Sequence, residues 1–416
     1  MKKTNAALIA MTLASLAGAL QAQSLPPIRP LGPVTAVAKE PLGAVSSVRH
    51  LPDGRVIVND IVARRVVMFD SSLSTVTLVA DTTSATASAY GTRPGGLIAY
   101  RGDSTLFIDP ASLSMLLIDP NGKIARVMSA PRAGDIGFLI GGPFGNPGFD
   151  PQGRLVYRAP PQFLMRGPPP SSGGMPDMPS PPDSAALVRF DLATRKLDTA
   201  TFFKTPKMNM NITRSPDGGI RMTSTVNPLL QGDDWAILSD GTIALVRAKD
   251  YHVDWLSPQG TLTSSPKIPF QWERLTDEAK VALIDSARTA IVKARASGQP
   301  GGGGEVMIRT IGGPGAAGAG SELPPPTMIS PSELPDYKPA FPPGSTRADA
   351  EGNLWIRTSQ NVNGIPVYNV INRKGELIDR VQLPKNRVLA GFGPGGVVYL
   401  AVRDGTIAHL EKARAK

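Results

Sequence analysis

The sequence contains no cysteine and only three histidines among 416 residues. Without cysteine the chain has neither a disulfide nor a thiol for lipid attachment. Zinc prefers nitrogen and sulfur ligands, and His50, His252 and His409 stand far apart with no second ligand at helical spacing. We therefore expect no zinc centre, and the absence of HExxH, GxSxG and P-loop motifs leaves the catalytic residues, if any, unknown.

The chain also lacks a run of five or more basic residues, although its formal net charge is +10. Its basic residues are scattered, and no aromatic side chains are interleaved with them in a patch. Nucleic-acid binding normally requires such clustering, so we expect no nucleic-acid partner. The simpler interpretation is a basic surface that only faces solvent. The more specific one is attraction to anionic ligands or to cell-envelope surfaces.

The longest apolar stretch lies at the beginning of the chain. Residues 1–22 combine Lys2 and Lys3, an alanine-rich apolar run, and small residues ending at Ala22. This order is typical of a secretory signal peptide cleaved near Ala22, and the run is too short and too alanine-rich to predict a membrane span. We expect a monomeric protein of a bacterial periplasm or of the exterior.

Glycine and proline are abundant, with 43 and 41 copies, and they punctuate a repeated pattern of short β-rich runs. Residues 349–384 show the pattern most clearly as a turn, a strand, a loop, a strand, a glycine turn and a third strand. The same order recurs in six units, whose turns include Pro52-Asp53-Gly54, Pro120-Asn121-Gly122 and Pro151-Gln152-Gly153. We predict an all-β fold, a six-bladed β-propeller of four-stranded antiparallel blades, formed by residues 23–416 as a single domain.

The last predicted blade ends one strand short, while Val34 to Lys39 forms a strand without a neighbour. A ring of sheets must close to avoid an open strand edge, so this N-terminal strand should complete blade six. Two alternatives remain at this point. One is a seven-bladed ring that counts residues 208–226 as a degenerate blade, and the other is a β-sandwich.

Two long inserts interrupt the blades. Residues 160–184 are proline-rich and predict a solvated loop. Residues 271–343 begin with a helical stripe of Leu283, Ala287, Ile291 and Ala294, which predicts a helix from Leu275 to Ser297 that packs on the propeller, followed by a Gly/Pro-rich loop. Loops after second strands and connections between blades share one face, so both inserts should overhang the same rim.

The blades with their Pro-Asp-Gly, Pro-Gln-Gly and Pro-Asn-Gly turns, over roughly 35–270 and 344–412, resemble six-bladed propellers of the NHL and TolB-like type. That resemblance implies the fold. Such propellers include calcium-dependent lactonases and lyases as well as non-enzymatic binding scaffolds, and the turn motifs carry no catalytic residue to this chain.

Function is therefore divided between two classes. We favour an exported scaffold that binds an unknown protein or an anionic small molecule at the insert-bearing face, without cofactor. The alternative is a hydrolase or lyase that uses calcium in the central channel. Oxygen ligands could converge from several blades, but these side chains equally suit strand ends and loop caps. The oxygen-bearing candidates are Asn59, Asp60, Asp109 and Asp250.

Four of the six second strands end with arginine: Arg158, Arg247, Arg357 and Arg403. Their strand ends should point to the insert-bearing face, where guanidinium groups around the channel mouth could form a ring that attracts a carboxylate or phosphate. The spacing from the preceding glycine varies, and a slip of one residue reverses the direction of a strand side chain. Solvated or paired arginines are the alternative.

Overall fold

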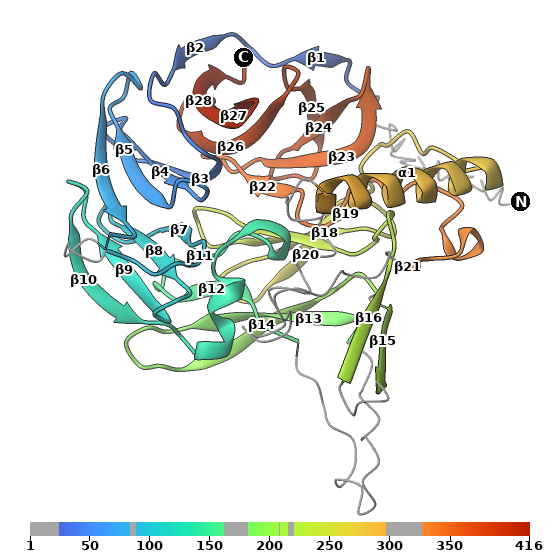
Figure 1. Cartoon of the computed structure of the whole chain (residues 1–416), viewed down its shortest axis with the longest axis horizontal. Coiled ribbons are helices and arrows are strands. Elements are labelled where there is room, and N and C mark those ends of the chain that lie inside the picture. Colours follow the sequence, from blue (N-terminus) through green and yellow to red (C-terminus); the bar gives the residue numbers. More distant parts are fainter. Residues whose placement is uncertain (1–24, 84–88, 162–181, 208, 215–219, 297–326) are drawn as a thin grey trace, which may run out of the picture.

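The computed structural model describes residues 25–83, 89–161, 182–207, 209–214, 220–296 and 327–416. It confirms a six-bladed β-propeller, in which six four-stranded antiparallel sheets surround a central axis (Figure 1). The predicted signal peptide, most of the 160–184 loop and the Gly/Pro-rich tract after residue 296 lie outside the described residues.

The first strand of each blade lies nearest the axis, and inner strands of neighbouring blades contact one another, as that of blade 1 does with those of blades 2 and 6. Blade 1 comprises β3 (Val45–His50), β4 (Val56–Asp60), β5 (Arg65–Phe69) and β6 (Val76–Asp81). Blade 2 comprises β7 (Gly96–Ala99), β8 (Thr105–Asp109), β9 (Ser114–Ile118) and β10 (Ile124–Ser129). Blade 3 comprises β11 (Gly148–Phe149), β12 (Leu155–Arg158), β13 (Ser184–Phe190) and β14 (Leu197–Lys204).

The remaining blades follow the same plan. Blade 4 comprises β17 (Asp234–Ile237), β18 (Ile243–Arg247), β19 (His252–Leu256) and β20 (Leu262–Ser264). Blade 5 comprises β22 (Thr346–Ala348), β23 (Leu354–Val362), β24 (Ile365–Ile371) and β25 (Leu377–Gln382). Blade 6 comprises β26 (Arg387–Gly393), β27 (Val397–Asp404) and β28 (Ile407–Arg414), and its fourth strand comes from the N-terminal segment.

The blades bury both faces of their middle strands, because each sheet is packed between two neighbours. Along β12, Leu155 and Tyr157 join the core shared with blade 2, whereas Val156 joins the core shared with blade 4. This alternation follows from the period of two in a strand. The Asp150–Gly153 turn closes with a 2.8 Å backbone hydrogen bond, and Gly153 adopts a φ of 76° that favours glycine.

The N-terminal segment closes the ring, as predicted. Strand β2 (Val34–Val37) pairs antiparallel with β28, opposing Val34 to Ala413. A second contact was not predicted: β1 (Ile28–Pro30) adds to blade 5 as a fifth strand, parallel to β25, so the segment clamps two blades. The Pro-rich composition of residues 24–33 hid this strand, because an edge position tolerates proline.

The predicted helix is confirmed as α1 (Asp277–Ala296), but its expected packing on the propeller is wrong. Its buried Ile284 and partly buried Leu283 pack with Leu229, β21 (Thr327–Met328) and the segment just after it. Strand β21 in turn adds in parallel to β16 (Ile220–Val226), which pairs with β15 (Asn209–Arg214). We call this three-stranded sheet with α1 and η3 (Pro331–Glu333) the satellite unit. It combines two separate inserts, and β15 and β16 therefore form no seventh blade.

Candidate functional site

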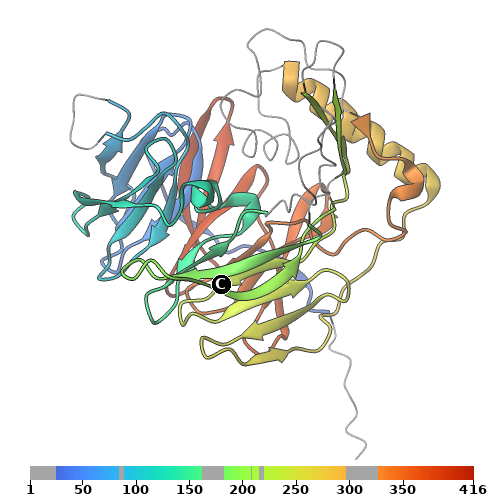
Figure 2. The same ribbon diagram turned by 90° about the horizontal axis from the view of Figure 1, so that it is seen from below.

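The insert-bearing face is defined by strand direction. Every second strand ends there, and every fourth strand leads from there into the next blade. The connections at residues 205–233 and 265–345 both leave this face and carry the satellite unit, which stands over one side of the ring (Figure 2). Loops on a rigid scaffold are where binding usually resides, so the site is sought here.

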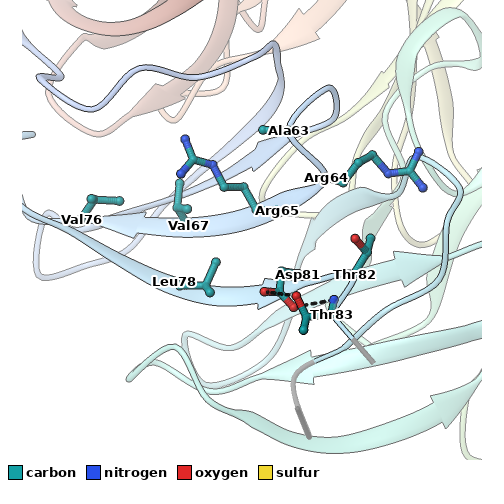
Figure 3. A pocket seen from close by; sticks show the side chains of 9 residues that line it. All are labelled: Ala63, Arg64, Arg65, Val67, Val76, Leu78, Asp81, Thr82 and Thr83. Atoms are coloured by element: carbon teal, nitrogen blue, oxygen red, sulfur yellow. Dashed lines mark hydrogen bonds between the residues drawn. The ribbon is translucent and has the colours of Figure 1, made fainter. Parts of the chain in front are cut away.

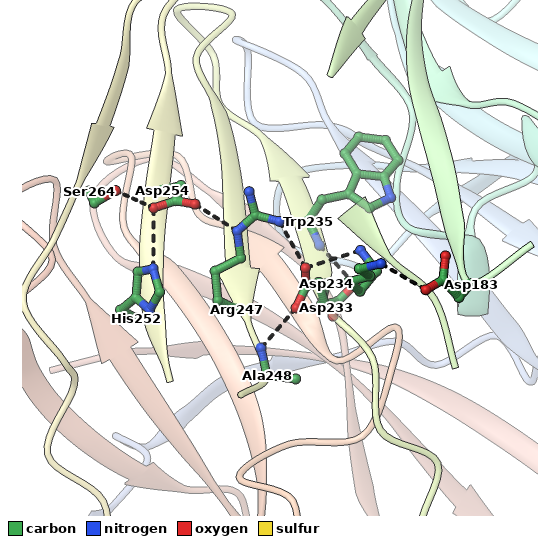
Figure 4. A network of polar contacts seen from close by, with 10 residues as sticks. Asp183, Asp233, Asp234, Trp235, Arg247, Ala248, His252, Asp254 and Ser264 are labelled. Carbon is green, nitrogen blue, oxygen red and sulfur yellow. Dashed lines mark hydrogen bonds and ion pairs between the residues drawn. The ribbon is translucent and has the colours of Figure 1, made fainter. Parts of the chain in front are cut away.

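A polar network holds the chain at the two ends of the first connection, residues 205–233, where it leaves blade 3 and enters blade 4 (Figure 4). The backbone N–H of Asp233 donates to Lys204 O at 2.8 Å, and the Asp233 carboxylate accepts from the Lys204 N–H at 3.1 Å. Arg247 Nη1 lies 2.8 Å from Asp233, and its Nε lies 2.6 Å from Asp254. Burial alone would lower the pKa of Arg247, but these two carboxylates raise it. Arg247 thus forms ion pairs that stabilise this connection.

The second connection, residues 265–345, contains a short antiparallel pairing with exposed aromatic side chains. Arg274 faces Tyr337, and the flanking backbone bonds, Leu275 N to Asp336 O and Lys338 N to Glu273 O, mark a non-hydrogen-bonded pair whose side chains lie close together. Trp272 precedes Arg274 by two residues, on the same face of the extended chain.

Trp272 is held firmly in spite of its exposure. Its ring packs edge-on to Phe270 at 5.3 Å, and Phe270 packs in the same manner on the buried Tyr251 at 5.5 Å. Yet Trp272 is 42% exposed and Tyr337 is 50% exposed. We call Trp272, Arg274 and Tyr337 the aromatic face. Tyr251, Val253 and Trp255 themselves lie in the core between blades 4 and 5.

Arg158 has the most unusual environment of the four predicted arginines. Its guanidinium carbon lies 5.2 to 5.9 Å from the ring centres of Phe138, Phe144 and Phe203. Its Nε is buried and has no hydrogen-bond partner among the described residues. Burial lowers the pKa of Arg158 to about 10, while the charge of Asp234 acts in the opposite direction. The group therefore remains charged at neutral pH, and it forms no ion pair with the described carboxylates.

Arg347, on the inner strand of blade 5, was missed in the sequence and lies beside the same segment. Its Nη1 donates to Asn146 Oδ1 at 2.9 Å, two residues from Phe144. Burial lowers its pKa, whereas Tyr368 and Asp234 oppose this shift. No ion pair forms between Arg347 and any carboxylate in the described part of the chain. Its position in the tripeptide Thr346-Arg347-Ala348 carries no motif that would identify it.

Asp234 is the buried carboxylate near both arginines. Its Oδ2 accepts the Thr346 N–H at 2.8 Å, and its Oδ1 accepts the Trp235 N–H at 2.9 Å. Both oxygens are thereby engaged by backbone. Burial raises its pKa. The carboxylate balances at most one of the two nearby guanidinium charges. We call Arg158, Arg347, Asn146 and Asp234 the mouth cluster.

The other two predicted arginines are exposed. Arg357 lies opposite Tyr368, just before the register of β23 shifts, and Arg403 donates through Nε to Gly405 O at 3.1 Å. Arg357 does not end its strand as predicted, because β23 continues to Val362. The surroundings of the four arginines also differ: one guanidinium lies among phenylalanines, one is ion-paired and two face solvent. A continuous anion ring stays a prediction.

The residues considered for calcium serve separate local roles. Asp60 accepts N–H bonds from Gly43, Ala44 and Ala63, at 2.9 to 3.1 Å. Asp109 accepts from Gly91 and Ala111 in the same way. Asn59 donates to Gly95 O, and Asp250 lies 3.3 Å from Lys267. Within the described ranges, no group of three histidine or acidic side chains is arranged to hold a metal.

A cleft of about 470 Å³ lies on the outer side of blade 1, away from the channel (Figure 3). Two of its charged side chains are engaged: Arg65 lies 2.9 Å from Glu40, and Asp81 accepts from Thr83 at 2.9 Å. Arg64 donates to Gly91 O at 3.5 Å. We assign it no function. Among the helices that the structure describes, none is long and apolar enough to cross a membrane.

Comparison with known proteins gives no family. No family model matches the chain, and no curated protein matches it. Among solved structures, a gluconolactonase from Xanthomonas campestris is 11% identical with a TM-score of 0.39, over 93% of this chain and 99% of that chain. A virginiamycin B lyase from Staphylococcus aureus is 12% identical with a TM-score of 0.39, over 90% and 98%.

The calcium-binding protein regucalcin from Agrobacterium tumefaciens is 9% identical with a TM-score of 0.34, over 94% of this chain and 98% of that chain. At these values the likenesses add nothing to the fold described above. No substrate, metal or functional residue is carried over from them.

Proposed function

We propose that this protein is an exported binding scaffold that recognises a protein partner through the satellite unit on its insert-bearing face. The observation that carries the proposal is the aromatic face. Trp, Tyr and Arg are the residue types that dominate binding energy at protein interfaces, and here Arg274 pairs with Tyr337 while the exposed Trp272 precedes Arg274 by two residues.

Rigidity supports the same conclusion. An anchor that is already ordered loses little conformational entropy on binding. Trp272 is fixed through Phe270 to the buried Tyr251, so it presents its exposed edge from the propeller core rather than from a loose loop. Arg274 forms no ion pair among the described residues, which favours an acidic group on the partner.

The test is capture of envelope proteins by the immobilised mature chain, residues 23–416. A double variant, Trp272→Ala with Tyr337→Ala, should lose a partner that the parent retains, since truncating such anchors costs about 2 kcal/mol or more each. The matched control is Phe202→Ala, which removes an aromatic that is 61% exposed on the outer strand of blade 3. Identical sets of proteins on all three resins would refute the proposal.

Metal analysis separates this proposal from the calcium-dependent hydrolase or lyase. The alternative requires a stoichiometric ion held at the channel. Calcium at one equivalent in the purified mature chain, lost together with activity on chelation, would displace the scaffold proposal. Binding of the partner that is unchanged by a chelator would support the scaffold.

A further inference from the structure

The mouth cluster contains two arginines, Arg158 and Arg347, that form no ion pair with a carboxylate among the residues that the structure describes. Arg158 and Arg347 touch the same connection, since Arg158 lies against the Phe144 ring and Arg347 bonds to Asn146. The charge of Asp234 acts on both arginines, so the two guanidinium groups lie in the neighbourhood of one carboxylate.

The connection itself is held rigidly at the mouth of the channel. Residues Gly142–Phe144 form the short helix η2, and Trp235 Nε1 donates to Phe144 O at 3.0 Å. Gly145 has a φ of 89° and packs so closely on the Trp235 indole that an added Cβ would lie 2.3 Å from it. The arginines are therefore placed by blades 3, 4 and 5 together and do not depend on a free loop.

A buried arginine without a counter-ion is costly, because desolvation is not repaid. The described acids near Arg158 and Arg347 are committed elsewhere. Asp234 accepts two backbone N–H groups, Asp233 is paired with Arg247, and Asp135 is paired with Arg132 at 2.7 Å. Three phenylalanine rings lie within 5.9 Å of the Arg158 guanidinium carbon, and its buried Nε has no hydrogen-bond partner among the described residues.

We propose that Arg158 and Arg347 form a binding site for the carboxylate group of a small organic acid at the channel mouth. A guanidinium edge donates two parallel hydrogen bonds to a carboxylate, and the low-dielectric phenylalanine surroundings strengthen them. Arg357 also acts on Arg347, so with Asp234 ionised the three arginines leave a net positive charge of +2, which suits a monocarboxylate or a dicarboxylate. The site is separate from the aromatic face, so either can fail without the other.

The test is isothermal titration of the mature chain with acetate and with succinate at low ionic strength, with inorganic phosphate as a third probe. Arg158→Met keeps an unbranched side chain against the phenylalanines, and Arg347→Gln keeps a donor for Asn146. Each change should weaken binding of the carboxylate about tenfold or more, since it removes a charged hydrogen bond. Arg403→Met, at the end of the equivalent strand of blade 6, should leave affinity unchanged.

Arg158→Lys separates bidentate recognition from charge alone. Lysine keeps the charge but loses the planar fork, so carboxylate affinity should remain reduced. Urea denaturation of each variant checks that the fold is retained. Three results would overturn the inference: no heat with either carboxylate, equal affinity in parent and both arginine variants, or phosphate binding more tightly than succinate.

Discussion

The clamp formed by the N-terminal segment can be tested by deletion. Removing residues 23–41 from the mature chain eliminates β1 and β2 and exposes the edges of β25 and β28. Leu31 is 6% exposed and Ala38 is 1% exposed in the folded chain, and both would be lost. Leu31 N donates to Gln382 O at 2.9 Å, and Ala38 N donates to Leu410 O at 2.8 Å.

The magnitude follows from these contacts. Burial of one leucine contributes about 1.5–3 kcal/mol, and each net hydrogen bond contributes about 1 kcal/mol. With the two ladders and the newly exposed core of blade 6, the loss reaches roughly 5 kcal/mol or more, which is comparable to the whole stability of a typical domain. We therefore expect residues 42–416 to lose the cooperative fold.

A shorter deletion divides the clamp into its parts. Removing residues 23–30 eliminates β1, the bidentate contact of Arg29 with Asp379 and the bond from Arg380 to Pro26 O, but it spares Leu31 and β2. This chain should remain folded with a stability lower by about 1–3 kcal/mol. Val37→Thr, at a β2 position that is 51% exposed, should change stability by less than about 0.5 kcal/mol.

Urea denaturation followed by circular dichroism and tryptophan fluorescence measures all four chains. Coincident transitions from the two probes establish whether unfolding is cooperative. If residues 42–416 unfold at the same urea concentration and with the same slope as residues 23–416, the strands do not close the ring, and the reasoning from edge exposure fails.

Three further substitutions test the interior of the molecule. Gly145→Ala combines an unfavourable positive φ with a Cβ that would lie 2.3 Å from Trp235, so it should cost about 2–5 kcal/mol in urea denaturation, and a loss below 0.5 would refute the close approach. Tyr157→Phe removes the 2.5 Å bond to the buried Asp135 and should cost about 1–3 kcal/mol, whereas Tyr100→Phe, whose ring packs edge-on to Phe149, serves as the comparison. Burial opposes ionisation of Asp254, but bonds from Ser264 and Arg247 lower its pKa below 3.8. Its ionised form therefore stabilises the fold above that pH, and this contribution disappears as pH falls through the lowered value. Asp254→Asn should reduce the free energy of unfolding at pH 7 and make its loss at acid pH less steep than in the parent. Parallel curves of stability against pH for parent and variant would contradict this.

The blades could be predicted from the sequence because their signals are local. Turn residues, strand alternation and the count of strands at the two ends of the chain were sufficient for six blades and their closure. The satellite unit could not be predicted, since β21 joins β16 through only two residue pairs from a distant insert. The apolar stripe of α1 identified a helix but not the surface that it covers.

The arginine sites show the same limit. The sequence placed Arg158 and Arg247 at strand ends. Only the fold shows that Arg247 is paired with two aspartates, whereas Arg158 is surrounded by phenylalanines. Arg357 lies where the register of β23 shifts, and such a shift decides which way a side chain points. Arg347 acquires its importance entirely from neighbours on other blades.

The pairing of the first strands with the last also sets the timing of folding. Val34 cannot meet Ala413 until nearly the whole chain has been synthesised, so β1 and β2 must wait without partners while the intervening blades form. Waiting strands are a hazard for aggregation. The prolines at 26, 27, 30, 33 and 41 interrupt this segment at short intervals, and proline disfavours continuous intermolecular strand pairing. The segment is thus suited to completing the ring and to avoiding pairing with other chains until β28 has formed.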